Sequence, residues 1–364
     1  MGKVYPSSGA KLHPHPPIGL GEAQALDYAM RPFTRLSADS MRPRHAQLES
    51  RELHAMTETR KAWLQIHFCV FMWGFTAILG RLITLPALTL VLWRMVMVSV
   101  LLFCVPAVWR GVRTLSRRHL LAFCGVGALV ALHWLTFYGA VKLANASVAA
   151  TCMATIPVFL CMIEPLVTGK PFAPRELLLG VLVLPGMALV VGGTPDAMNI
   201  GVVTGIVSAF LAALFGAYNK RLIHRTDALS ATALEMVSGG LLVLGLTALL
   251  GLWPEQSGDA AFLPATQDRF AMPGGDDLLY MGLLAVACTL LPFTLSLWAL
   301  RHLSAFASAL AVNLEPLYAI VLAMLFLGEQ RELGAGFYAG ASVLVGVVLL
   351  YPLMFRARPP KAIL

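Results

Sequence analysis

The sequence has few charged residues for its length. Of its 364 residues, only 13% are charged, whereas 58% are hydrophobic. A soluble domain usually carries about 25% charged and about 45–50% apolar residues. One buried core cannot hold this surplus of apolar side chains, which excludes a soluble enzyme, a nucleic-acid-binding domain and a disordered chain. We therefore expect a polytopic membrane protein.

The motifs of several enzyme classes are also missing. No CxxC pair with nearby histidines occurs among the six cysteines, so neither a disulfide framework nor a metal site is indicated. The chain lacks the GxxxxGK[ST] phosphate loop, which argues against direct use of ATP, and it lacks HExxH and GxSxG. We expect no cofactor, no metal ion and no catalytic residue, so the protein is not expected to be an enzyme.

Much of the charge lies in the first 61 residues. This segment contains nine basic and six acidic residues, a Pro/His run at residues 13–17 and no long apolar stretch. It has too little apolar surface to offset the entropy of ordering, which predicts a disordered cytoplasmic tail over residues 1–61. A regulatory or lipid-binding segment is one alternative, and a translation start at Met56 is another. Residues 356–364 are expected to form a short basic cytoplasmic tail.

Ten apolar runs follow the tail, each near the length of about 20 helical residues that crosses a bilayer. The runs are continuously apolar and do not alternate, which indicates helices rather than barrel strands. The expected fold is therefore an all-α integral membrane protein with ten transmembrane helices. The expected spans are residues 62–80, 88–109, 120–141, 146–168, 177–193, 200–219, 229–253, 278–298, 304–327 and 333–355.

The lysines and arginines of the short loops predict the orientation. If the N-terminus is cytoplasmic, thirteen of them lie in inner loops or the C-terminal tail and four in outer loops. Basic residues concentrate on the cytoplasmic side of membrane proteins. We therefore expect a multi-pass protein of the cell's inner (plasma) membrane, with both termini in the cytoplasm.

The chain contains an internal repeat. The segment Ala-Val-Lys-Leu-Ala-Asn-Ala at 140–146 parallels Ala-Leu-Arg-His-Leu-Ser-Ala at 299–305, and each is followed by a proline at the same distance. The predicted halves, residues 62–193 and 194–355, contain five spans each, and an odd number of spans inverts the second half. Inverted repeats are typical of secondary transporters, whose binding site lies near the midplane between the halves.

These features resemble the drug/metabolite transporter superfamily, in its EamA-type ten-helix branch. The resemblance covers residues 62–355 and implies a secondary transporter that exports amino acids, their derivatives or other metabolites by alternating access. The implied partners are a small-molecule solute and the lipid bilayer, without nucleic acid; a homodimer is left open. The residues that carry the resemblance are Trp73-Gly74-Phe75, Arg94 within residues 92–97, residues 138–147, residues 299–303, Glu315-Pro316 and residues 325–329.

One position departs from the family pattern. After the fourth span, where the family usually has Gly-Glu, this chain has Gly169-Lys170. The terminal glutamate is therefore present only in the second half, as Glu329. This difference puts in doubt any role that a symmetric pair of such glutamates has.

Ionisable side chains inside a bilayer cost roughly 2.5–3.5 kcal/mol each on insertion scales, so each is a candidate site residue. Glu315 lies near the middle of its span and precedes Pro316. This proline removes one helix hydrogen bond and frees a carbonyl near Val312. A distortion with the carboxylate of Glu315 and the amide of Asn313 would suit binding of a substrate or a proton. Pairing that only fastens the helix is the alternative.

Three further intramembrane charges have less direct interpretations. Arg94 and Glu235 both lie seven residues into their spans, in halves of opposite orientation, so we expect them in opposite leaflets. Both are expected to be structural charges that reach the interface partly by snorkelling. Glu164 lies near the cytoplasmic end of its span and is a candidate gate residue that Lys170 could pair with.

Aromatic residues indicate a second part of the site. Trp134 and Tyr138 are four residues apart and share one helix face, which Trp73 and Trp298 could join. Such a set could line a cavity for a planar or amphipathic solute, whereas anchoring at the interface is the alternative. His133 beside this face either couples protons or is a packing histidine.

The most different functional alternative is an intramembrane lipid-modifying enzyme. It would need several polar residues clustered at one interface, whereas the intramembrane acids are scattered over three spans. Glycines four residues apart, Gly201-x3-Gly205 and Gly336-x3-Gly340, are interpreted as sites where helix backbones approach closely.

Overall fold

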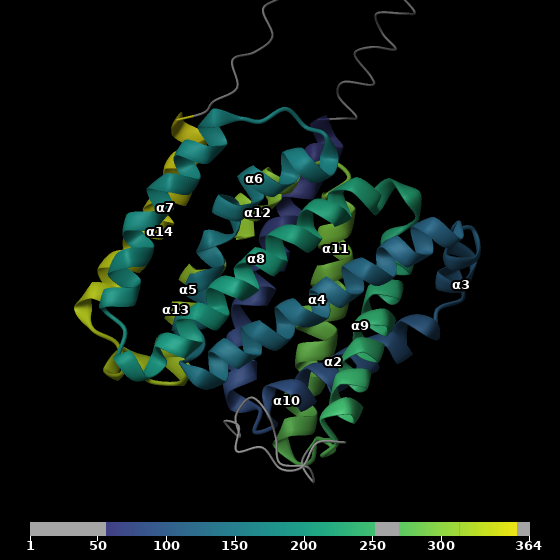
Figure 1. Ribbon diagram of the computed structural model, residues 1–364, viewed down its shortest axis with the longest axis horizontal. Coiled ribbons are helices and arrows are strands. Elements are labelled where there is room, and N and C mark those ends of the chain that lie inside the picture. Colours follow the sequence, from purple (N-terminus) through teal and green to yellow (C-terminus); the bar gives the residue numbers. More distant parts are fainter. Residues whose placement is uncertain (1–55, 252–268, 313, 355–364) are drawn as a thin grey trace, which may run out of the picture. The chain divides into compact units, whose positions relative to one another are not determined.

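The computed structural model describes residues 56–251, 269–312 and 314–354, and every regular element in these ranges is a helix (Figure 1). Most of the two expected tails, most of the stretch between the spans expected at residues 229–253 and 278–298, and Asn313 lie outside the described residues. The first helix already begins at Met56, six residues before the predicted start of the first span.

Seven helical stretches in the described part are long and apolar enough to cross a membrane, or eight if the bent pair α2–α3 counts as one span. The apolar parts of α7 and α14 are shorter. A π-helical turn, Val286–Leu290, joins α10 to α11. The elements are helix Met56–Leu82, α2 (Ala87–Phe103), α3 (Pro106–Arg113), α4 (Arg117–Leu143), α5 (Ala146–Cys152), α6 (Ile156–Thr168), α7 (Pro174–Gly192), α8 (Asn199–Leu222), α9 (Ala228–Gly251), α10 (Asp276–Ala285), α11 (Leu291–Ala299), α12 (Ala305–Val312), α13 (Glu315–Phe326) and α14 (Ala335–Met354).

Large apolar side chains point outward along these helices. Leu64, Leu166 and Leu325 are 66%, 85% and 74% exposed. Contiguous exposed apolar surface is rare on soluble monomers. The exposed apolar side chains and the number of apolar helices together indicate an integral, multi-pass membrane protein.

The second predicted span, residues 88–109, is not one straight helix. The structure turns by 90° between α2 and α3. Pro106 occupies the first turn of α3, where its missing N–H costs nothing, whereas the same residue would interrupt a continuous helix. The prediction is therefore wrong beyond Phe103, and Trp109 lies on a separate short helix.

Glycines allow the close helix contacts that their spacing predicts. α7 and α14 run side by side (Figure 1). A Cβ added to Gly340 would lie 2.5 Å from the carbonyl oxygen of Gly186 and 2.6 Å from the nitrogen of Val190. A Cβ added to Gly201 would lie 2.6 Å from that of Ala144. The interpretation of these glycines as packing residues is confirmed.

Gly340→Ala should destabilise the protein because the new methyl group would overlap backbone atoms of α7. We expect the free energy of unfolding to fall by about 1–3 kcal/mol. Gly346→Ala on the same helix is the matched control, since a Cβ there meets nothing within 4 Å. It should be neutral, or stabilising by up to about 1 kcal/mol through helix propensity. Thermal unfolding in detergent measures both; equal effects would contradict the close contact.

Equivalent basic residues of the repeat make equivalent contacts. The ammonium of Lys142 donates to the carbonyl of Ile83, at the end of the first helix, at 2.5 Å. At the corresponding position, Arg301 donates to the carbonyls of Ile223 and Thr226 after α8, at 3.3 and 2.5 Å. Cations stabilise helix C-termini because unpaired carbonyls and the helix dipole both favour positive charge.

Candidate functional site

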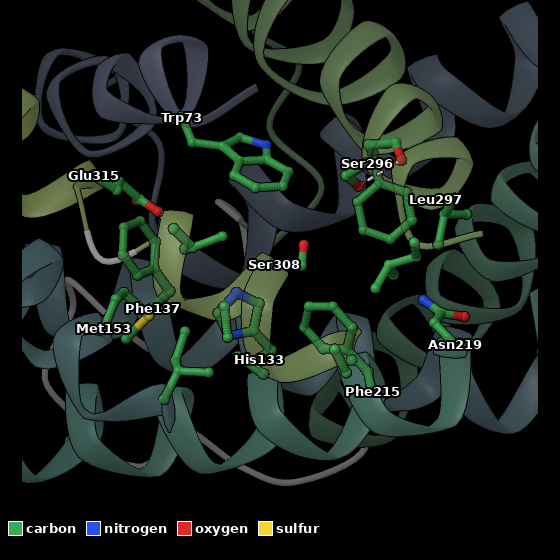
Figure 2. A pocket seen from close by; sticks show the side chains of 18 of the residues that line it. Trp73, His133, Phe137, Met153, Phe215, Asn219, Ser296, Leu297, Ser308 and Glu315 are labelled. Atoms are coloured by element: carbon green, nitrogen blue, oxygen red, sulfur yellow. Dashed lines mark hydrogen bonds between the residues drawn. The ribbon is translucent and has the colours of Figure 1, made fainter. Parts of the chain in front are cut away.

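A cavity of about 140 Å³ lies among the helices, and elements of both predicted halves line it (Figure 2). From the first half come the helix Met56–Leu82, α2, α4 and α6; from the second half come α8, α11, α12 and α13. Helices from distant parts of the chain therefore meet at one internal space.

Aromatic rings form much of the cavity wall. Trp73 and Trp134, both expected from the sequence, line it together with Phe137, Phe215 and Phe293. Trp134 and Phe293 occupy equivalent positions of the repeat, and their rings touch edge to face with centroids 6.1 Å apart. Such a wall suits a planar or apolar group of a solute.

Two of the expected aromatic residues lie elsewhere. Trp298 is not among the lining residues and packs on His302, with ring centroids 4.7 Å apart. Tyr138 is fully buried and does not line the cavity either. A Cβ on Gly80 would overlap the Tyr138 ring, so this glycine makes room for the tyrosine.

Arg94 lies inside the protein and on the cavity wall. Its side chain is only 2% exposed. Nη1 donates to the hydroxyl of Tyr138 at 2.7 Å, and Nε donates to the hydroxyl of Thr289 at 2.6 Å. The guanidinium carbon lies 3.7 Å from the centre of the Trp134 ring, in cation–π contact. The expectation that Arg94 snorkels to the interface is therefore wrong, because its length is used to reach these inner partners.

The partners of Arg94 on the opposite half come from an irregular part of the helix. Pro292 has no N–H, so the carbonyl of Cys288 one turn earlier lacks its usual donor. The π-helical turn over Val286–Leu290 lies at this place. Nη2 of Arg94 lies 3.5 Å from the Cys288 carbonyl oxygen. Such turns are frequent at functional sites.

Glu315 begins α13, directly after the break in the ninth predicted span. α12 ends at Val312 and α13 starts at Glu315, with Pro316 in its first turn, so the distortion expected from the proline is present. The side chain is 6% exposed and lines the cavity. Among the described residues it has no hydrogen-bond or ion-pair partner. The cavity thus holds one cation, Arg94, and one carboxylate.

His133 is anchored by α8. Its Nδ1 lies 3.0 Å from the carbonyl oxygen of Ser208, and the Ser208 hydroxyl donates to the carbonyl of His133 at 2.9 Å. Nδ1 therefore carries the proton, an assignment that follows from the hydrogen-bond network. The ring also lines the cavity.

Glu164 and Glu329 cap helices of the opposite half. Glu329 accepts hydrogen bonds from the N–H groups of Ala146 and Ser147, at 3.0 and 2.9 Å, at the start of α5. Glu164 accepts from the N–H of Phe306, in the first turn of α12, at 3.2 Å. Ser147 and Phe306 are equivalent positions of the repeat. The carboxylate missing at Lys170 is therefore supplied by Glu164, and the ammonium of Lys170 lies 3.7 Å from it.

Glu235 is fully buried, so its side chain does not reach the interface by snorkelling as expected. Asn219 of α8 donates to it at 3.3 Å. Arg94 and Glu235 make no ion pair with each other among the described residues. Asn219 and Ser308 line the cavity but were not expected; an asparagine inside a predicted span was the available signal.

This architecture defines the class: a polytopic helical membrane protein with a polar and aromatic cavity among its helices. The chain belongs to the EamA-like transporter family, whose model matches residues 61–192 and again residues 199–352. The resemblance to the drug/metabolite transporter superfamily is thereby confirmed.

Solved structures share the fold. Twenty-two chains match, and one of them, described only as "Crystal structure of protein", aligns with a TM-score of 0.57. The alignment covers 82% of this chain and 98% of the other at 15% sequence identity. No curated protein matches the sequence.

Proposed function

We propose that this transporter is a secondary exporter of small organic solutes, such as amino acids or related metabolites. The observation that carries the proposal is the central cavity, where Arg94 and Glu315 face an aromatic wall made by both halves. An amino acid offers a carboxylate to the first, an ammonium to the second and, in many cases, an apolar side chain to the rings. The chain belongs to a family of transporters, and in this proposal the solute crosses the membrane without being chemically changed.

The mechanism that we propose is alternating access between two inverted five-helix halves that together form ten spans. Matched contacts support it. Lys142 and Arg301 cap helix C-termini, whereas Glu164 and Glu329 cap helix N-termini across the halves. Contacts between the halves must break and re-form when the cavity opens to either side. In this mechanism Glu164 acts in a gate, both termini lie in the cytoplasm and the protein resides in the inner (plasma) membrane.

The site residues take the following proposed roles. Glu315, Trp73 and Trp134 contact the solute. Arg94 is added to these contact residues, and Tyr138 acts by holding the Arg94 side chain in place. Asn313 stays a sequence-based candidate beside Glu315. His133 orients the solute or couples protons.

Filling the cavity should stop transport. Ala212 of α8 lines the cavity and is 6% exposed, so Ala212→Phe places a ring in the space of about 140 Å³. We expect at least about a tenfold loss of flux, corresponding to roughly 1.4 kcal/mol of lost solute binding. Solutes found by thermal shift on the purified protein are tested in proteoliposomes.

The matched control is Val203→Phe, since Val203 lies on the same helix and is 62% exposed. It should transport at the wild-type rate. Wild-type flux in Ala212→Phe, with the same thermal shift by the solute, would contradict the proposal that this cavity is the transport site. Conversion of the solute without flux would indicate an enzyme instead.

A further inference from the structure

Glu235 is a buried acid with one unsatisfied oxygen. Its side chain on α9 is 0% exposed. Oε2 accepts a hydrogen bond from Nδ2 of Asn219 at 3.3 Å, whereas Oε1 has no partner among the described residues. A buried carboxylate oxygen without a partner carries an uncompensated desolvation cost.

Asn219 has the same deficit and connects this acid to the cavity. It is 1% exposed, and its Oδ1 also has no hydrogen-bond partner in the described part of the chain. Figure 2 shows Asn219 at one end of the cavity, near Leu297, and Asn219 is a lining residue. One polar side chain therefore separates Glu235 from the solute space.

The basic groups of the neighbouring helices do not neutralise Glu235. None of them makes a described ion pair or hydrogen bond with it. Arg94 is bound to Thr289 and Tyr138, and Lys220 donates to the carbonyls of Leu300 and Leu303. The elements packed against α9 are α2, α3, α4 and α11, and α8 reaches Glu235 through Asn219. Their titratable or charged side chains are Arg94 on α2, Arg110 and Arg113 on α3, Arg117, Arg118, His119, Cys124, His133, Tyr138 and Lys142 on α4, and Tyr218, Lys220 and Arg221 on α8; α11 carries none.

A single proton satisfies both unpaired oxygens. If Oε1 of Glu235 carries the proton, it donates to Oδ1 of Asn219, while Nδ2 of Asn219 donates to Oε2. The two side chains then form the closed ring of two hydrogen bonds that a carboxylic acid makes with an amide. A neutral acid also avoids an unpaired charge in the protein interior.

We infer that Glu235 is a proton-binding site that exchanges with the central cavity through Asn219. Release breaks the Oε1–H bond, leaves the carboxylate and passes the proton to water in the cavity. The bond from Oε1 to Asn219 is lost at the same time, so protonation changes the side chain at the end of the solute space. The site itself is independent of the proposed function; only its coupling to solute export rests on that function.

Infrared spectroscopy of the purified full-length protein tests the site without any solute. We expect a carbonyl band of a neutral carboxylic acid at pH 7 that disappears in Glu235→Gln. Glutamine preserves the ring with Asn219, because an amide can donate and accept in place of the acid, so the variant should fold. Asp196→Asn, at an exposed position, is the control and should keep the band. Asn219→Leu should shift the band because the acid loses its partner.

Proteoliposomes with a pH gradient test the coupling. With one proton per solute, a gradient of one pH unit corresponds to about 1.4 kcal/mol and supports about tenfold accumulation. Glu235→Gln should exchange solute at equal pH but lose this accumulation, whereas Asp196→Asn should retain it.

Identical infrared spectra of wild type and Glu235→Gln between pH 5 and pH 9 would overturn the proton site. Accumulation by Glu235→Gln equal to that of the wild type would overturn the coupling. A wild-type protein that shows the band but transports no solute would count against the proposed function and would support the proton site on its own.

Discussion

Glu329→Gln is expected to lower the free energy of unfolding by about 3 kcal/mol, because hydrogen bonds to a buried charged group contribute about 1.5–3 kcal/mol each. Glu329 is 1% exposed and accepts from the N–H groups of Ala146 and Ser147, and from the Ser147 hydroxyl at 2.6 Å. Glutamine has the same shape, but its NH₂ group would face an N–H donor. The negative charge that favours the helix N-terminus is lost as well.

The matched control for this variant is Glu332→Gln, three residues away. Glu332 is exposed and accepts one hydrogen bond, from the Asn145 amide at 3.1 Å. We expect a loss of at most about 1 kcal/mol, typical of exposed polar contacts. Chemical unfolding in detergent measures both variants. A Glu329→Gln protein as stable as Glu332→Gln would show that the cap does not hold the two parts together.

The sequence did not predict this cap; it showed only that the terminal glutamate is present in the second half, as Glu329. The repeat aligns Lys170 with Glu329, and this difference predicted that a symmetric pair of carboxylates was missing. The structure shows that Glu164 reaches the same kind of N-terminus from six residues earlier in the chain. An alignment compares residues at one position, whereas a carboxylate can reach one N–H group from several positions on a helix.

Apolar helices can be predicted from composition because a helix needs about 20 apolar residues to cross a bilayer. Of the ten expected spans, the described part of the chain contains seven or eight helical stretches that are long and apolar enough. The turn after Phe103 was not predicted, although Pro106 gave a local signal for it. Apolar residues continue through this proline, and span prediction by hydrophobicity does not register where the backbone changes direction. The distortion before Pro316, argued from the missing N–H itself, is present in the structure.

The cavity was predicted in part. Aromatic residues well inside their spans, such as Trp73 and Trp134, were expected there and line it. Arg94 and Glu235 were expected to reach the interface because their positions were counted along the sequence. Counting does not show that Tyr138 and Thr289 lie within reach of a long side chain. Only the packed structure shows which polar groups a buried charged side chain contacts.

Arg94→Gln is expected to weaken solute binding about a hundredfold, the equivalent of roughly 2.7 kcal/mol, which is within the range for a hydrogen bond to a charged group. In contrast to Glu329→Gln, the fold should lose little stability or gain some. A buried cation without an adjacent anion costs desolvation, and a neutral side chain removes that cost. The ligand is the tightest solute found by thermal shift, and its affinity is measured by calorimetry.

Two further variants separate the charge of Arg94 from its geometry. Arg94→Lys keeps the charge but cannot stack flat on Trp134 or donate to Tyr138 and Thr289 together, so we expect an intermediate loss of affinity. Tyr138→Phe removes one fixing hydrogen bond and should cost about tenfold or less, near 1 kcal/mol. Arg118→Gln, at an exposed position, is the control and should bind normally. Wild-type affinity in Arg94→Gln would mean that the buried cation does not contact the solute. A fall in stability parallel to the fall in affinity would mean that Arg94 only holds α2 and α4 to the π-helical turn.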